Sequence, residues 1–396
     1  MKIFNYIIIG GGMTGSSAAM AIHNHDPNGT IAMFSKENYR PYNRPPLTKG
    51  LWDGKELADI TRDMEKYDVH LFLDDPVSKI DREAKTITDR KGLSYQYDKL
   101  LIATGGLPIH LPDSPEGIIY YRSISDYEAL NQLVQKKSDF CVIGGGFIGS
   151  EITAALNKQG KNVTMIFPET GVSGLRFPDD LALFLNAYYE EKGVTIFNGH
   201  LVDSIEKHGD GYLVKYKAVN SNDIEEIHFD GVIVGIGIRP DLDLAKEAEL
   251  KVDNGIVVNE FLQTNDPDIY AAGDVAFFLN VPLGKRMRVE HEDNANKMGA
   301  VAGQNMAGEK QVYDHMPFFY SDLFDLGYEA VGETNKDYEI IEDWIDPFKK
   351  GTIFYLKDDR IRGLIFWNLW GKVDQGSDLI KEGNQYQPSE LRGLFS

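Results

Sequence analysis

The chain opens with a short apolar run, Tyr6 to Ile9, which is followed directly by a glycine-rich turn and an Ala-rich stretch, Ser16 to Ile22. Unbroken apolar runs of this length are typical of strands in a parallel sheet, and the Ala-rich stretch predicts a helix. The turn between them has the pattern Gly10-x-Gly12-x-x-Gly15. A strand, this turn and a helix together predict the start of a βαβ unit.

The same pattern returns later in the chain. An apolar run, Phe140 to Ile143, leads into Gly144-x-Gly146-x-x-Gly149 and a predicted helix, Ser150 to Lys158. Each copy is followed by a further apolar run that we interpret as the second parallel strand, Thr30 to Phe34 and Asn162 to Phe167. The sequence therefore predicts an α/β protein with two Rossmann-like dinucleotide-binding domains.

Later apolar runs indicate the last strand of each of these domains. Apolar runs ending at glycine, Leu100 to Gly106 and Gly231 to Gly237, are expected to be the last strands of the two copies, and the alternating stretches before them predict antiparallel strands. Beyond about Pro317, aromatic residues gather in strand-like runs without a third glycine pattern. We predict a discontinuous first domain (1–114 and 239–316), a second domain (115–238) and a C-terminal α+β domain (317–396).

Composition and charge exclude several classes of protein. The 396 residues contain 41 Lys and Arg against 61 Asp and Glu, a net charge of −20, so unspecific attraction to nucleic acid or to an anionic membrane surface is not expected. No apolar stretch has the roughly 20 residues needed to span a bilayer. The N-terminal run has no cleavage-like site after it, which predicts a cytoplasmic protein. Cys141 is the only cysteine, so the chain forms neither a dithiol centre nor a Cys-rich metal site.

The two glycine patterns predict where dinucleotides bind. The first glycine of each pattern allows the tight turn, the second lets a pyrophosphate approach the backbone, and the third lets helix and strand pack closely. The phosphates then lie at the helix N-terminus, where free N–H groups and the helix dipole favour negative charge. This set comprises Gly10, Gly12, Gly15, Gly144, Gly146 and Gly149.

An acidic residue about 20 positions beyond the fingerprint is expected to bind a ribose. In the second copy this is Glu169, whose carboxylate would accept the 2′-hydroxyl and repel a 2′-phosphate, so NADH is preferred to NADPH. The alternative is a solvated loop glutamate after Pro168. In the first copy the corresponding place holds Lys36 and Glu37, and which of the two contacts the ribose stays open.

An apolar strand that ends in Gly273-Asp274 distinguishes the two nucleotides. A carboxylate at this place can bind a ribityl hydroxyl, which FAD has and NAD lacks, and the next helix would direct its positive end toward the flavin. We therefore expect FAD in the first domain and NADH in the second.

The segment Pro41-Tyr42-Asn43-Arg44-Pro45-Pro46-Leu47-Thr48-Lys49 resembles the Pro-Tyr-x-Arg-Pro-Pro-Leu-Ser/Thr-Lys stretch of the FAD-dependent pyridine nucleotide reductases. Within that family it is similar to the branch of the apoptosis-inducing factors and bacterial ferredoxin reductases. The C-terminal third strengthens the likeness through Val289 to Asp293, Tyr320 to Leu323 and Leu364 to Asn368. The resemblance implies a glutathione reductase-like FAD/NAD(P) fold.

The resemblance also implies site residues. Besides the glycines and Gly273, the residues expected to line FAD are Arg44, Lys49, Val77, Arg122, Asp274, His291 and Tyr320. The residues expected to contact NADH are Phe147, Ile148, Glu169, Gly237, Glu290, Glu329 and Asn368. Further expected cofactor-binding residues are Thr14, Ala103, Thr104, Gly105 and Glu292. Lys49 and Glu151 are implied as a catalytic pair beside the flavin's reactive nitrogen. No metal is expected, because the adjacent His291, Glu292 and Asp293 cannot all face one ion.

Three departures from the family pattern limit what it implies. The acidic residue that is expected to bind the FAD ribose at the place of Lys36 is shifted to Glu37. Tyr320 replaces a tryptophan of the apoptosis-inducing factors, and their regulatory insertion and N-terminal targeting region are not expected here, so cell-death signalling is not implied.

The predicted function is hydride transfer from NADH to FAD without a redox disulfide, then electron transfer to a quinone-like or protein acceptor. One alternative is an NADH:ferredoxin or rubredoxin reductase component, which needs a basic patch around Arg286 and Arg288 to attract an acidic carrier. Another is an NADH-responsive, redox-dependent binding or signalling protein with slow turnover. Monomer and homodimer stay open.

Overall fold

The computed structural model describes residues 1–395 and divides the chain into two compact units. The first unit contains Met1–Arg44, Glu56–Leu107 and Arg239–Phe318; the second contains Pro45–Lys55, Pro108–Ile238 and the chain from Phe319 on. The chain crosses between the units after Arg44, Lys55, Leu107, Ile238 and Phe318. The crossings after Leu107 and Ile238 lie in β7 (Gly106–Pro108) and β16 (Ile238–Pro240). Each unit contains one of the two glycine fingerprints.

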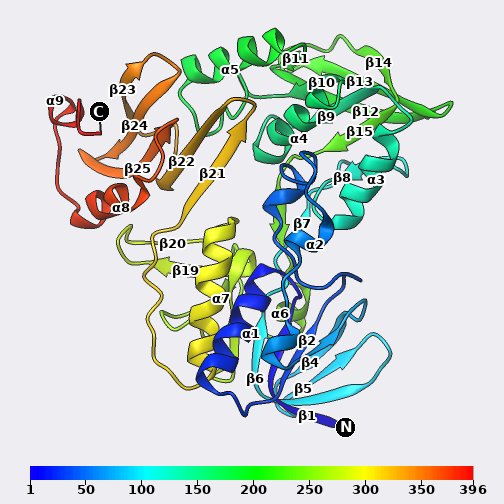
Figure 1. The fold of residues 1–396 in the computed structure, drawn as a ribbon, viewed down its shortest axis with the longest axis vertical. Helices are drawn as coiled ribbons and strands as arrows, with labels where there is room; N and C mark the ends of the chain where they lie inside the picture. The colour runs from blue at the N-terminus through cyan, green and yellow to red at the C-terminus, as the bar shows by residue number, and fades with distance from the viewer. Residues whose placement is uncertain (396) are drawn as a thin grey trace. The chain divides into compact units, whose positions relative to one another are not determined.

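A mixed sheet forms the centre of the first unit (Figure 1). Its strands, in spatial order, are β3 (Val69–Phe72), β2 (Ile31–Phe34), β1 (Lys2–Ile9), β6 (Ser94–Ile102), β5 (Thr86–Asp89) and β4 (Val77–Asp81), and β18 (Ile269–Ala271) pairs with β6. β1 is parallel to both β2 and β6, and Ile7 and Ile8 are completely buried. Burial on both faces explains why β1 ends in an unbroken apolar run.

Two helices of the first unit, α1 (Met13–His25) and α7 (Glu292–Met306), lie side by side (Figure 1). Their backbones approach closely because α7 carries glycine at the contact: a Cβ on Gly299 would lie 2.3 Å from the Thr14 carbonyl oxygen, and one on Gly303 would lie 2.4 Å from that of Ala18. The unit also contains α2 (Leu57–Ile60), η2 (Glu65–Tyr67), α6 (Asp243–Glu247), η3 (Gly273–Val275), and the small sheet of β17 (Ile256–Val257), β19 (Ala276–Asn280) and β20 (Lys285–Met287).

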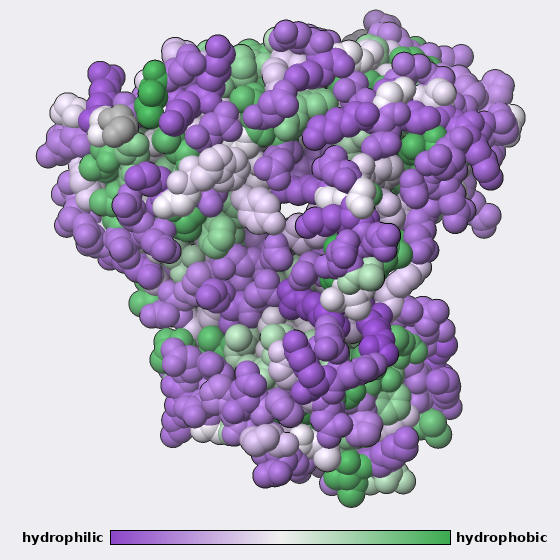
Figure 2. All heavy atoms as spheres, in the orientation of Figure 1, coloured by the Kyte–Doolittle hydropathy of each residue, from purple (hydrophilic) through white to green (hydrophobic). Residues whose placement is uncertain are grey.

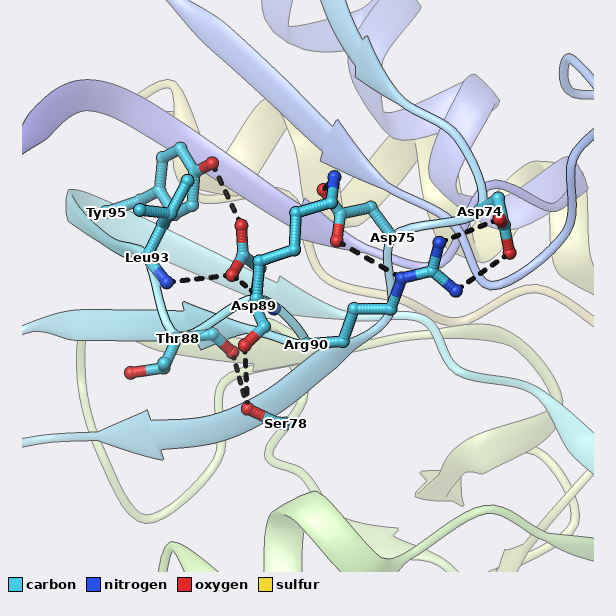
Figure 3. Close-up of polar contacts among 9 residues, drawn as sticks. Asp74, Asp75, Ser78, Thr88, Asp89, Arg90, Leu93 and Tyr95 are labelled. Atoms are coloured by element: carbon cyan, nitrogen blue, oxygen red, sulfur yellow. Dashed lines mark hydrogen bonds and ion pairs between the residues drawn. The ribbon is translucent and has the colours of Figure 1, made fainter.

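The turn from β5 to β6 is fixed by the buried carboxylate of Asp89 (Figure 3). Asp89 accepts the backbone N–H groups of Lys91 and Leu93 and the hydroxyl of Tyr95, at 2.9, 2.8 and 3.1 Å. Side-chain oxygens of aspartate commonly hold turns in this way. Because Asp89 is also opposite Val77 in the β4–β5 register, the turn holds in place the strand that begins at Val77.

The second unit has a parallel sheet and two antiparallel ones (Figure 1). The parallel sheet consists of β11 (Thr195–Asn198), β10 (Asn162–Phe167), β9 (Asp139–Ile143), β15 (Gly231–Val234) and β8 (Ile119–Tyr120); a separate sheet consists of β12 (His200–His208), β13 (Gly211–Ala218) and β14 (Glu225–Phe229). The helices that accompany them are η1 (Pro45–Leu47), α3 (Ile124–Val134), α4 (Phe147–Lys158) and α5 (Asp179–Glu191).

The C-terminal part of the second unit is an antiparallel sheet with two helices. Its strands, in spatial order, are β21 (Phe318–Leu323), β22 (Leu326–Gly332), β25 (Arg360–Trp367), β24 (Lys350–Lys357) and β23 (Glu339–Asp346), followed by α8 (Val373–Glu382) and α9 (Pro388–Leu391). Some of the aromatic side chains of this region form its core: Tyr328, Trp367 and Phe366 are completely buried, whereas Tyr320 and Trp370 are exposed.

The predicted fold class is confirmed: two Rossmann-like domains and a C-terminal sheet domain. Both fingerprint helices begin earlier than predicted, at Met13 and Phe147 rather than Ser16 and Ser150. The reason is that Gly12 and Gly146 are the N-caps, so Gly15 and Gly149 lie inside the helices. β1 also begins earlier, at Lys2.

Candidate functional site

The first fingerprint forms a tight passage from β1 into α1. A Cβ on Gly10 would lie 2.1 Å from the carbonyl oxygen of Ala103, and a Cβ on Gly15 would lie 2.0 Å from that of Gly10. At Gly12, in contrast, a Cβ would meet no atom of the described chain within 4 Å. The first turn of α1 contains no acidic residue. An open helix N-terminus without carboxylates fits a pyrophosphate group.

The second fingerprint repeats this geometry between β9 and α4. A Cβ on Gly144 would lie 2.5 Å from the carbonyl oxygen of Gly235, and one on Gly149 would lie 1.9 Å from that of Gly144. Gly146 is again open, and the first turn of α4, which includes Phe147 and Ile148, has no acidic residue. The observed backbone therefore fits a second pyrophosphate group at α4.

Glu169 lies two residues beyond the end of β10, and its carboxylate has no hydrogen-bond or ion-pair partner among residues 1–395. The loop that carries it is joined to the fingerprint, because the N–H of Ser173 donates to the carbonyl oxygen of Gly145 at 2.8 Å. An unpaired carboxylate in this loop is available to accept ribose hydroxyls.

The corresponding loop of the first unit holds Lys36 and Glu37 in different ion pairs. Glu37 accepts Arg44 at 2.5 Å and the hydroxyl of Tyr42 at 2.6 Å. Burial opposes ionisation of Glu37, but the Arg44 guanidinium and Tyr42 outweigh it and lower the pKa of this carboxyl. Lys36 lies 3.7 Å from Asp241 and is half exposed. Glu37 is therefore an ionised carboxylate that Arg44 and Tyr42 hold in one position.

Gly273 and Asp274 form the short η3 after β18. Gly273 has a φ of +78°, and a Cβ there would lie 2.3 Å from the hydroxyl oxygen of Thr14. Asp274 is therefore next to the first turn of α1. The nearby α7 begins with the N-cap His291, and Glu292 and Asp293 in its first turn offset part of the positive end of its dipole. Asp293 also pairs with His315.

A cluster of polar residues surrounds Lys49 in the second unit. Its ammonium lies 3.3 Å from Glu151 and 3.0 Å from Asp322, and it lies over the Tyr320 ring at 4.3 Å from the centroid. The Glu151 side chain is 9% exposed and that of Asp322 is 52% exposed. Lys49 is thus held between a buried and an exposed carboxylate.

Two hydroxyl groups fix Glu151 further. Thr48 donates to Oε2 at 2.5 Å, and Ser321 donates to Oε1 at 2.6 Å. Each carboxylate oxygen of Glu151 therefore has a short hydrogen bond, and Lys49 approaches Oε1. We did not predict Thr48, Ser321 or Asp322 as site residues, although Thr48 was part of the quoted motif and Ser321 and Asp322 follow Tyr320 directly.

The other expected site residues are distributed over both units. In the first unit, Ala103 bonds to β1, Thr104 and Gly105 bond to the backbone of Asp241, Val77 begins β4, and Glu290 pairs with Arg288. In the second unit, Arg122 precedes α3, and Gly237 follows β15 with a φ of +106°. Glu329 accepts the backbone N–H of Gly371, and Asn368 accepts that of Gly327.

The single thiol of the chain lies in the core of the second unit. Cys141 is completely buried in β9, and burial raises the pKa of its thiol. Among the described residues, no group of three His, Cys, Asp or Glu side chains could hold a metal ion. No helix within residues 1–395 is long and apolar enough to cross a membrane, and the face drawn in Figure 2 is largely hydrophilic.

Two glycine turns with open space at Gly12 and Gly146, each between a parallel strand and a helix, are typical of a protein that binds two dinucleotides. Residues 4–299 match the model of the family described as pyridine nucleotide-disulphide oxidoreductase, and residues 333–382 match that described as the mitochondrion-associated C-terminal region of apoptosis-inducing factor. The chain belongs to the pyridine nucleotide-disulphide oxidoreductase family, and it is an FAD-dependent NAD(P)H oxidoreductase.

Individual relatives agree with this assignment. The chain is 34% identical to mitochondrial apoptosis-inducing factor 1 of Dictyostelium discoideum, over 95% of this chain and 78% of that protein. It is 33% identical to monodehydroascorbate reductase 3 of Arabidopsis thaliana, over 98% of this chain and 94% of that protein. The crystal structure of the ferredoxin reductase for the CYP199A2 system from Rhodopseudomonas palustris superposes with a TM-score of 0.90 at 26% identity, covering 100% of this chain and 98% of that one.

Proposed function

We propose that the chain transfers hydride from NADH to FAD with the help of Lys49 and Glu151, and then passes electrons to an external acceptor. In this proposal residues 1–114 and 239–316 bind FAD, residues 115–238 bind NADH, and residues 317–396 complete the enzyme. The observation that carries the proposal is the buried pairing of Lys49 with a carboxylate that two hydroxyls hold in place.

Each member of the cluster has a role in this proposal. FAD, when bound, supplies the hydride-accepting ring. The Lys49 ammonium would stabilise the negative charge that the flavin ring gains, and a fixed charge needs no reorganisation during the reaction. Glu151 holds the ammonium in one position, while Thr48 and Ser321 restrict the rotation of the Glu151 carboxylate. The cluster thus acts through orientation and electrostatics.

NADH is the preferred reductant in this proposal. The free Glu169 carboxylate can accept ribose hydroxyl groups, and its negative charge would repel a 2′-phosphate. No dithiol relay within this chain can lie between NADH and the acceptor, because Cys141 is its single cysteine.

The acceptor is proposed to be a small oxidant or a basic partner. The names of the relatives point to two kinds of acceptor, a small molecule for the monodehydroascorbate reductase and a ferredoxin for the ferredoxin reductase. Arg286 donates to the carbonyl oxygens of Val258 and Phe277, and Arg288 pairs with Glu290. Arg288 is thus paired with an acid, whereas the exposed Arg286 bonds to neutral carbonyl oxygens and keeps its positive charge. The net charge of −20 of the whole chain would repel an acidic carrier.

Ionic strength distinguishes these acceptors. A carrier protein that docks by charge gives a rate that falls steeply as salt rises, whether an acidic carrier docks on a local basic patch or a basic carrier docks on the acidic surface. A small neutral oxidant gives a flat curve, which is the result we expect for that acceptor. A cytoplasmic location stays a prediction, and so does a monomeric or homodimeric state. Sedimentation with and without NADH under anaerobic conditions tests the alternative function, a redox-dependent binding protein.

The Lys49→Ala variant tests the proposed centre. We expect slower flavin reduction by NADH while FAD stays bound, because the variant removes the positive charge and leaves the glycine cradle intact. Lys192→Ala is a matched control, since Lys192 pairs with Asp325 at 2.6 Å on the surface of the same unit. Equal reduction rates in both variants and the native protein would remove Lys49 from the proposed centre.

A further inference from the structure

Arg62 makes an unusual set of hydrogen bonds in the first unit. It lies between α2 and η2, and its guanidinium donates to groups from three separate parts of the chain. These acceptors are the Met13 carbonyl oxygen at 3.1 Å, Ser16 Oγ at 2.9 Å, Ser17 Oγ at 3.1 Å, Asn43 Oδ1 at 2.8 Å and Asn296 Oδ1 at 2.7 Å. All three nitrogens of the guanidinium are therefore used.

The groups that contact Arg62 are all uncharged. Among residues 1–395 no carboxylate lies within ion-pair distance of Arg62. Burial lowers the pKa of this guanidinium, and the attraction of Glu292 on α7 offsets only part of that effect. Since arginine stays protonated at neutral pH, the protein keeps a positive charge here without a directly paired acid.

The hydroxyl groups around Arg62 form a closed network. Ser16 donates its hydrogen to the Met13 carbonyl oxygen at 2.9 Å, and Ser17 donates to Asn296 Oδ1 at 3.1 Å. Both hydroxyls thus donate elsewhere and accept from Arg62. Removal of the guanidinium would leave several partly buried acceptors short of a donor, which is costly.

The three parts of the chain that Arg62 joins are those assigned to FAD. Met13, Ser16 and Ser17 lie in the first two turns of α1, Asn43 precedes Arg44, and Asn296 lies one turn beyond Glu292 in α7. We propose that Arg62 is a positioning residue of the FAD site: it holds α1, the Arg44 segment and α7 together and places positive charge beside the α1 turn that receives the pyrophosphate. The inference rests on the assignment of FAD to this unit.

Replacement of Arg62 tests this role through FAD binding. In Arg62→Met we expect the dissociation constant of FAD from the apoprotein to rise by about 10- to 100-fold, since several charge-assisted hydrogen bonds are lost. Arg62→Lys keeps the positive charge but not the forked geometry, so we expect the dissociation constant of FAD to rise by an intermediate factor of about 3- to 10-fold. The unfolding temperature of this apoprotein should be nearly native. Flavin fluorescence during titration gives the constant.

Arg82→Met is the matched control. Arg82 is a half-buried arginine of the same unit, and it bonds to Asp266 and to the carbonyl oxygens of Ala248 and Glu249. This variant loses similar bonds, so we expect lower stability with an FAD affinity close to native. Native affinity in both Arg62 variants, or equal losses for Arg62→Met and Arg82→Met, would overturn the inference. A native apoprotein that binds no FAD would instead overturn the proposed function.

Discussion

Replacement of Glu151 by glutamine removes the buried negative charge beside Lys49 and changes little else. The amide has nearly the same shape as the carboxylate, and its oxygen can still accept one of the two hydroxyl hydrogens from Thr48 and Ser321. Asp322, at 3.0 Å, is then the remaining carboxylate beside Lys49. We expect the ammonium to shift toward Asp322 and flavin reduction by NADH to slow.

The size of the effect follows from the geometry. At 3.3 Å and an effective dielectric constant near 20, the attraction between Lys49 and Glu151 is about 5 kcal/mol before the cost of desolvation. Asp322 retains part of this attraction, although it is half exposed and therefore screened. Loss of one charge-assisted contact is then worth about 1.5–3 kcal/mol. If this loss falls on the transition state, the rate decreases by roughly 10- to 150-fold.

The assay is anaerobic stopped-flow reduction of the bound flavin by NADH. Glu333→Gln is the matched control, because Glu333 is also buried and pairs with Arg362 at 2.7 Å in the C-terminal sheet. We expect this control to lower stability and leave the reduction rate unchanged. A native rate in Glu151→Gln, or an equal decrease in both variants, would refute the electrostatic role of Glu151.

Two further predictions concern the nucleotide cradles. Glu169→Arg should weaken NADH binding and improve NADPH binding, because it replaces a negative charge by a positive one at the predicted ribose; an unchanged ratio of the two kcat/KM values would exclude Glu169 from that site. Above pH 4.5 the native protein should have a larger free energy of unfolding than the Glu37→Gln variant. This difference should disappear as the pH falls through the lowered pKa of Glu37, because protonation removes the attraction of Glu37 to Arg44. Urea unfolding of both apoproteins across this pH range measures the difference, and a constant difference would contradict the stated origin of the shift.

Local patterns were sufficient to predict the main elements of the fold. The apolar runs at Tyr6–Ile9 and Phe140–Ile143 are buried on both faces, so their composition indicated parallel strands directly. The start of β1 was missed because Ile3 is exposed and polar residues interrupt the run. The helix starts were missed because Gly15 and Gly149 lie inside helices, where glycine is usually unfavourable.

Contacts between distant segments could not be predicted in the same way. Thr48 and Ser321 lie 103 and 170 residues from Glu151 in the chain, and only the folded second unit brings their hydroxyls to its carboxylate. Arg62 likewise reaches Asn296 across 234 residues. The resemblance to a family indicated Lys49 and Glu151, whereas the residues that position them follow from tertiary structure alone.

Anaerobic titration of the purified flavoprotein with NADH tests the central claim most directly. The claim is that nicotinamide reduces the flavin without a sulfur relay. We predict that about one equivalent of NADH bleaches the flavin completely in the native protein, and equally in Cys141→Ser, since the thiol is buried and takes no part. Protein that binds no flavin, or bound flavin that NADH leaves oxidised, would contradict the account.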